Sequence, residues 1–277
     1  MTGRECYAKA LGNCKGKLTD EHYVSEHVLS QFEVGGELNV AGLPFAHLLG
    51  GRSVSASSLT ARILCEKHNN DLSPVDTVWG KFLMEFFTAH NALLDGTLTT
   101  DSVLSIDGTL LERWMLKFAS GWISSGNARL DGGQTVAHKT PPPIGLLRML
   151  YALDPFPNKW GWYTLAPAPK TSDDRMHFGL TPTYENHSET QVRLSGVKMD
   201  HYGFVSFVRL ITPMLPHPGI DLSQFQYRPE FFEISRESTG RKAMIQLAWP
   251  MPKRGNGFKV AVVGEGEKPP ATAVNPA

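Results

Sequence analysis

The pattern of hydrophobic and polar positions changes along the chain. Between about residues 76 and 153, apolar side chains recur at helical spacing in "VDTVWGKFLMEFFTAHNALL" and "DGTLLERWMLKFASGWI", and "IGLLRMLYAL" predicts a third, shorter helix. Asp76 is expected to cap the first of these helices, and Asp107 or Thr109 the second. From about residue 159, short runs such as "GFVSFVRLI" and "KAMIQLAWP" predict the strands of an antiparallel sheet.

The first 78 residues keep neither pattern for long. They hold all three cysteines and a middle rich in glycine and serine, "VGGELNVAGLPFAHLLGGRSVSASS", so this segment is expected to need a staple. The chain as a whole is expected to have an α+β fold. Its expected parts are a stapled module at 1–78, a helical segment at 79–155, an antiparallel β-rich domain at 156–263 and a disordered tail at 264–277.

Cysteine and histidine spacing indicates what the staple is. Cys6 and Cys14 are separated by seven residues, and Cys65 and His68 form a C-x2-H pair some fifty residues later. Three thiolates and one imidazole make a ligand set suited to a structural zinc ion, in which the C-x2-H half is a good knuckle and the other half is looser. Three cysteines are an odd number for a disulfide framework. The alternative is that the cysteines are reduced and buried, with an unrelated histidine on the surface.

Charge and hydropathy restrict the expected partners. Lys+Arg and Asp+Glu both number 27, so no overall basic field attracts nucleic acid, and phosphate binding would need a local patch. The 41% hydrophobic and 19% charged fractions are those of an ordinary soluble protein. The first residues lack the apolar core of a signal peptide, and no run approaches the length of a membrane span. We therefore expect a cytoplasmic protein without a membrane partner.

The pair Glu-His occurs twice in "TDEHYVSEHVLSQF", as Glu21-His22 and again as Glu26-His27. A carboxylate beside an imidazole is typical of metal-dependent hydrolases. Residues five apart point to opposite faces of a strand and lie well apart on a helix. Only one of the two pairs can therefore face a given site.

The order of these motifs resembles a known family. Two cysteines, then "LTDEH", a long glycine-rich loop and "ILCEKHNNDLS" are similar to the zinc-stapled HNH endonucleases of the ββα-metal type. The resemblance covers about the first 80 residues. In that family a strand presents an acidic residue followed by histidine, a loop and a second strand follow, and the helix after the second knuckle supplies a further Asn or His. This favours Glu21-His22, while Ser25 is expected to cap a short helix whose first turn carries Glu26 and His27.

The resemblance implies a role for each matching residue. His22 would deprotonate the attacking water, and Glu21 would supply an oxygen ligand to a catalytic Mg²⁺ or Mn²⁺. Asn69 would be the metal ligand on the helix, with Asn70 as the alternative, although either amide could instead be a cap or turn residue. Glu21 and His22 can converge only if a twist or bulge alters the strand. The family's middle Asn has no clear counterpart, and Arg62 could bind the phosphate instead.

These implications define the expected function and its competitors. The expected function is metal-dependent cleavage or nicking of DNA, with RNA left open as a substrate. Modules of this kind with an unfamiliar C-terminal domain resemble effectors of anti-phage defence, in which the second domain selects a target or responds to a protein or small-molecule activator. The competing function is a non-catalytic zinc module that binds nucleic acid or a protein partner. A catalytic zinc activated by Glu21 is a third alternative, but four protein ligands would close its coordination sphere.

Overall fold

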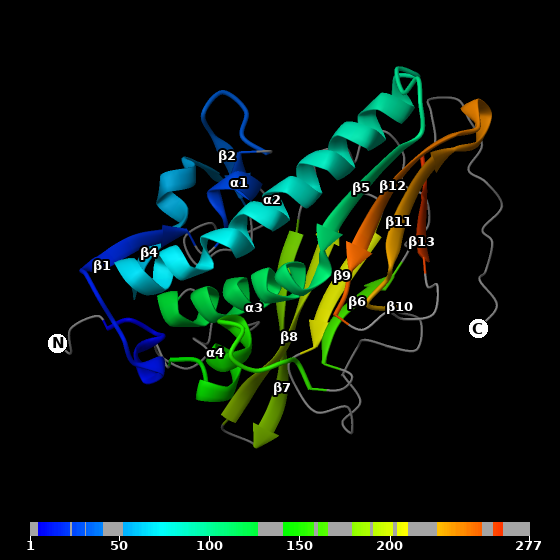
Figure 1. The fold of residues 1–277 in the computed structure, drawn as a ribbon. Helices are drawn as coiled ribbons and strands as arrows, with labels where there is room; N and C mark the ends of the chain where they lie inside the picture. The colour runs from blue at the N-terminus through cyan, green and yellow to red at the C-terminus, as the bar shows by residue number, and fades with distance from the viewer. Residues whose placement is uncertain are drawn as a thin grey trace. The chain divides into compact units, whose positions relative to one another are not determined.

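A computed structural model gives the fold. It describes residues 5–22, 24–30, 32–40, 52–126, 141–157, 160–165, 179–188, 191–201, 204–209, 226–250 and 257–262. The expected α+β class is confirmed, with N-terminal strands and a helix, further helices in the middle and mainly antiparallel strands towards the C-terminus (Figure 1). The tail predicted at 264–277 lies outside the described residues.

The chain divides into two compact units. Unit 1 comprises residues 1–81, 110–156 and 186–193, and unit 2 comprises residues 82–109, 157–185 and 194–277. The residues of the predicted helical segment, 79–155, belong to both units. None of the helices in the described part of the chain combines the length and apolar character needed to cross a membrane.

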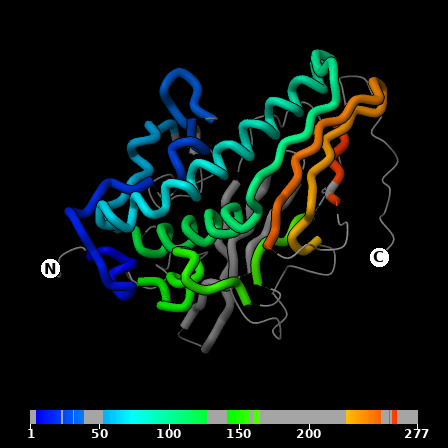
Figure 2. The backbone as a smooth tube through the Cα atoms, in the orientation of Figure 1, coloured from blue at the N-terminus to red at the C-terminus, as the bar shows by residue number. Residues whose placement is uncertain are grey.

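Unit 1 is built around a ββα arrangement. Strand β1 (Leu18–His22) pairs antiparallel with β4 (Thr60–Cys65), and β4 leads directly into helix α2 (Glu66–Leu94) (Figure 2). The other elements that lie wholly within this unit are η1 (Lys9–Leu11), α1 (Glu26–Leu29), β2 (Leu38–Val40), β3 (Arg52–Val54), η2 (Ala56–Leu59) and α4 (Ile144–Leu150).

Helix α3 (Gly108–Ser125) contributes large buried side chains to the unit 1 core. Its apolar side chains recur at helical spacing and are buried, and Trp114 stacks on Trp79 of α2 with 4.8 Å between the ring centroids. Asp107 caps this helix as predicted, because its carboxylate accepts a 2.8 Å hydrogen bond from the Thr109 amide.

Helix α2 begins ten residues earlier than the expected cap at Asp76. Pro74 lies inside the helix, where its missing N–H leaves one backbone hydrogen bond unmade. Asp76 is therefore not an N-cap, and its carboxylate is available for contacts with other helices. The far end of α2 belongs to unit 2, and there the Arg236 guanidinium of the same unit donates to the carbonyls of Leu93 and Leu94 at 2.9 and 2.6 Å.

Unit 2 contains two sheets. The five-stranded sheet has the order β10-β6-β9-β8-β7, with β6 (Gly161–Leu165), β7 (Gly179–Ser188), β8 (Gln191–His201), β9 (Phe204–Arg209) and β10 (Gln226–Tyr227). The four-stranded sheet has the order β13-β11-β12-β5, with β5 (Ser102–Asp107), β11 (Phe231–Arg236), β12 (Arg241–Ala248) and β13 (Gly257–Ala261), and η5 (Glu237–Thr239) joins β11 to β12.

Strand β5 was not expected, because it interrupts the predicted helical segment. It pairs in parallel with β12, placing Ile106 opposite Leu247, and β13 pairs in parallel with β11. This sheet is consequently mixed, whereas the five-stranded sheet has antiparallel pairs from β10 to β8. An aromatic cluster of Phe82, Trp162 and Phe232, all fully buried, forms the core of the unit.

Candidate metal centre and adjoining acidic site

The N-terminal segment is tied to β4 and α2 by backbone hydrogen bonds. The Tyr7 amide donates to the Ile63 carbonyl at 2.8 Å, and the Glu66 amide donates to the Lys17 carbonyl at 3.0 Å. A further bond of 3.2 Å runs from the Lys67 amide to the Lys15 carbonyl. These bonds bring the first two cysteines beside the junction of β4 and α2.

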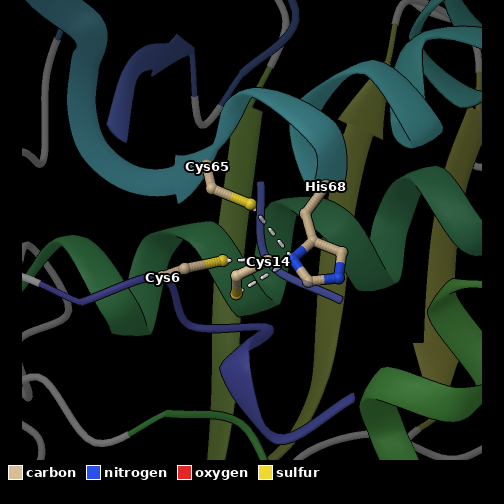
Figure 3. Close-up of side chains that lie close together, drawn as sticks. All are labelled: Cys6, Cys14, Cys65 and His68. Carbon is tan, nitrogen blue, oxygen red and sulfur yellow. Dashed lines mark hydrogen bonds between the residues drawn. The ribbon is translucent and has the colours of Figure 1, made fainter. Parts of the chain in front are cut away.

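The four predicted zinc ligands converge at this junction (Figure 3). Cys65 ends β4, His68 lies in the first turn of α2, and Cys6 and Cys14 come from the N-terminal segment. The three sulfur atoms lie 3.3, 3.6 and 3.3 Å from Nδ1 of His68, and all four donor atoms lie within 4.8 Å of one another. Zn–S and Zn–N bonds at a tetrahedral angle would separate sulfur and nitrogen by about 3.6 Å. The cluster therefore fits a zinc ion held by four protein ligands.

The protonation preferences of these ligands differ. Burial raises the pKa of Cys6 to about 12 and also raises the pKa of Cys14. For Cys65, burial acts in the same direction, but hydrogen bonds from the amides of His68 and Lys15 outweigh it and lower the pKa. Burial lowers the pKa of His68, which favours the neutral imidazole that a metal requires. Zinc is the charge that would stabilise three neighbouring thiolates.

Gly16 holds the turn that carries Cys14 to the cluster. Its φ is +80°, and a Cβ at this position would lie 2.2 Å from Oε2 and 2.8 Å from Cβ of Glu66. We expect Gly16→Ala to lower the free energy of unfolding by about 1–3 kcal/mol and to weaken zinc retention, because the backbone is strained and the helix start must shift. Thermal melting and zinc content measure the two effects. Gly12→Ala is the control, since its φ is also positive but a Cβ there meets no atom within 4 Å; equal losses in both variants would contradict the explanation from the Glu66 clash.

Glu21 lies next to this cluster but faces the interior of unit 1. It is 5% exposed and sits opposite Ala61 in the β1–β4 pair, and the nearby Asn69 side chain favours the charged carboxylate by lowering its pKa. A register irregularity at Thr19 and Asp20 immediately precedes it. The strand and the helix therefore bring together two of the residues that the sequence assigned to a metal.

Lys117 of α3 forms an ion pair with Glu21. Its ammonium is paired with the Glu21 carboxylate and lies 2.8 and 2.7 Å from the two carboxylate oxygens of Asp76. Burial would lower the pKa of Lys117, but Asp76 and Glu21 outweigh it and raise that pKa, so the ammonium stays charged. Burial raises the pKa of Glu21, opposed by Lys117 and by the hydrogen bond from Asn69.

Asp76 is in turn held by the side chain of Ser25, the residue directly before α1. The Ser25 hydroxyl donates to Asp76 at 2.5 Å, and the indole N–H of Trp114 donates to the Ser25 oxygen. Ser25 occupies the expected N-cap position of α1 but makes no side-chain capping bond, and its oxygen instead accepts from the Trp114 indole while its proton goes to Asp76. The expected cap role of Ser25 is thus replaced by a contact across the core.

The remaining predicted residues lie in different surroundings. His22 is half-buried opposite Thr60, and its Nε2 atom is buried without a hydrogen-bond partner among the described residues. His27 is exposed on α1. Arg62 is exposed, and its guanidinium contacts the Asp20 carboxylate at 2.9 and 3.3 Å, so it pairs with a protein anion in this structure.

Sequence reasoning did not assign Asp76 and Lys117 to the site. Asp76 reads as a helix cap when its helix is expected to begin there. For Lys117 a signal exists, because it is the one charged residue in "WMLKFA" within an otherwise apolar stretch of α3. A charge on a buried helix face needs a partner, but the sequence does not say which one.

No protein-family model, curated protein or solved structure matches this chain. The structure itself shows a Cys3His cluster that could bind zinc, beside a ββα arrangement.

Proposed function

We propose that the N-terminal module is an HNH-type endonuclease that hydrolyses phosphodiester bonds of DNA. The observation that carries this proposal is that the Asn69 amide lies close enough to the Glu21 carboxylate to lower its pKa, one residue away from the candidate zinc ligand His68. This places the end of β1 beside the first turn of α2, as the resemblance to the family requires. The Cys3His cluster would hold zinc in a structural role, because four protein ligands leave no position for substrate.

Each residue of the centre has a task in this proposal. His22 would take a proton from the attacking water through Nε2, which is buried and has no hydrogen-bond partner among the described residues. Glu21 and Asn69 offer a carboxylate and an amide oxygen, which are ligand types suited to Mg²⁺ or Mn²⁺. Such an ion supplies charge neutralisation at the phosphate and at the leaving oxygen. Arg62 could bind a neighbouring phosphate on exchanging its contact with Asp20.

Unit 2 would then provide targeting or sensing. The proposal includes a response to a protein or small-molecule activator, in the manner of anti-phage defence effectors, and a cytoplasmic location. This role for unit 2 is inferred from the architecture alone. It predicts that an added activator, or a particular nucleic acid, changes the rate of cleavage and leaves the zinc content of the protein unchanged.

Plasmid nicking tests the proposed activity. With Mg²⁺ or Mn²⁺, the zinc-loaded protein is expected to convert supercoiled plasmid to nicked circles, and His22→Ala should reduce the rate by about 100-fold to 10,000-fold through loss of the general base. His27→Ala is the matched control and should leave the rate within about twofold, because His27 is exposed on another element. A labelled RNA assayed in parallel decides between the two substrates. Equal rates for His22→Ala and the unaltered protein would refute the assignment.

A non-catalytic zinc module is the second candidate. It is favoured by the burial of Glu21 and Lys117 as an ion pair, because buried charges held in this way are often structural. In that case the zinc-loaded protein would cleave neither plasmid nor RNA under any metal condition. A mobility shift of labelled DNA, insensitive to His22→Ala, would then identify a binding module.

A further inference from the structure

Lys117 places a positive charge where the proposed catalytic ion would bind. Its ammonium pairs with Glu21 and lies within 2.8 Å of both carboxylate oxygens of Asp76. A divalent ion bound by Glu21 would approach the same carboxylate in the same interior, where Glu21 and Lys117 are 5% and 3% exposed. The lysine and the ion therefore compete for one location.

The charge balance of the site does not allow the divalent ion and the Lys117 ammonium to be bound together. The carboxylates of Glu21 and Asp76 carry two negative charges, and Lys117 leaves one of them uncompensated. A divalent ion in place of the ammonium would neutralise the pair, whereas both cations together would leave an excess positive charge in a buried site. Uncompensated charge in such surroundings costs several kcal/mol. Binding of the ion and seating of Lys117 should accordingly exclude each other.

The surrounding contacts keep the lysine in place. The Ser25 hydroxyl donates to Asp76 and is itself held by Trp114, which lies three residues before Lys117 on α3. Trp114 stacks on Trp79, so α2 and α3 hold the acid and the lysine in register. Withdrawal of Lys117 requires these contacts to loosen.

We propose that Lys117 is an intramolecular lock on the catalytic centre, which holds Glu21 and Asp76 until a divalent ion displaces it. The proposal rests on the proposed function for the identity of the ion. It adds Asp76 as a second carboxylate of the centre and gives the resting protein a low affinity for Mg²⁺ and Mn²⁺.

Direct Mn²⁺ binding tests the lock without measuring cleavage. Electron paramagnetic resonance reports free Mn²⁺ in titrations of the zinc-loaded full chain. We expect Lys117→Met to bind one Mn²⁺ at least about tenfold more tightly than the unaltered protein, a change of about 1.4 kcal/mol. Lys117→Arg should not gain affinity, because it keeps the charge. Lys81→Met is the control, since it removes an exposed lysine of α2.

The gain must depend on the carboxylates. Adding Glu21→Gln to Lys117→Met is expected to abolish it. Equal Mn²⁺ affinity for Lys117→Met and the unaltered protein, or a gain that survives Glu21→Gln, would overturn the lock. If Lys117→Met gains Mn²⁺ affinity but the unaltered protein does not nick plasmid, only the nuclease proposal is refuted. If the unaltered protein nicks plasmid but Lys117→Met gains no Mn²⁺ affinity, only the lock is refuted.

A second measurement covers the case in which Lys117→Met does not fold. The melting temperature of the unaltered protein should be the same with and without about 0.1 mM Mn²⁺, because a locked centre binds little of the ion and ligand stabilisation scales with occupancy. A Mn²⁺-dependent increase that disappears in Glu21→Gln would show an open centre and overturn the proposal.

Discussion

Replacement of His68 by alanine is expected to release zinc and to unfold the N-terminal part of unit 1. The described part of the segment before β1 contains one short helical turn, is attached to β4 and α2 by backbone bonds and buries Tyr7 and Ala8, so two of the four cluster residues lie in a segment with little regular structure. Structural zinc contributes apparent binding free energies of about 10–16 kcal/mol in small zinc-binding peptides. A loss on this scale equals or exceeds the total stability of an ordinary domain, about 5–15 kcal/mol.

Zinc content, measured by mass spectrometry, and far-ultraviolet circular dichroism read out this result. His27→Ala is the matched control, because it removes an exposed histidine of the same unit and should keep one zinc per chain. Chelator treatment of the unaltered protein should reproduce the His68→Ala spectrum. If His68→Ala retained stoichiometric zinc and its melting temperature, the Cys3His cluster would not be the staple.

Trp114→Ala should destabilise unit 1 by about 3–5 kcal/mol, the range for removing a large buried aromatic side chain. Trp114 is 1% exposed, stacks on Trp79 and lies 6.3 Å from Phe118, so its removal opens a cavity between α2 and α3. It also removes the donor to Ser25. Urea denaturation followed by circular dichroism gives the change in free energy.

Trp114→Phe separates packing from the hydrogen bond. It keeps an aromatic ring but lacks the indole N–H, so we expect a smaller loss of about 1–3 kcal/mol. Leu153→Ala is the baseline, because Leu153 is 54% exposed. Equal losses for Trp114→Ala and Leu153→Ala would mean that the stacked pair does not stabilise the unit.

The fold is predictable where a pattern is local. The periodic apolar runs of α2 and α3 and the alternating runs of the C-terminal strands identify these elements from sequence. Strand β5 is missed because its partner, β12, lies about 140 residues away. Its six residues lie directly before a helix and, taken alone, read as the connection leading into it. The start of α2 is misplaced because Pro74 suggests a boundary, although the helix continues through it.

The site residues, too, are predictable only where a local motif marks them. Cysteine and histidine spacing identifies the four residues that converge, since three cysteines and one histidine form a common ligand set for structural zinc. The neighbours of Glu21 are harder to predict, because Asp76 and Lys117 come from two other helices and carry no motif. Side-chain pairing across a core depends on helix packing, which a single sequence does not specify.

The adjacency of His68 and Asn69 restricts how this protein can vary in sequence. Each residue of a helix is rotated by about 100° from the one before it, so a residue inserted between these two positions would turn Asn69 away from Glu21. The four residues of the cluster all precede the insertion and would keep their spacing, whereas Asp76 and Trp79 follow it and would turn with Asn69. A homologue with such an insertion is therefore expected to keep the cluster while losing the arrangement around Glu21, and alignments that score the cysteines alone would not distinguish the two.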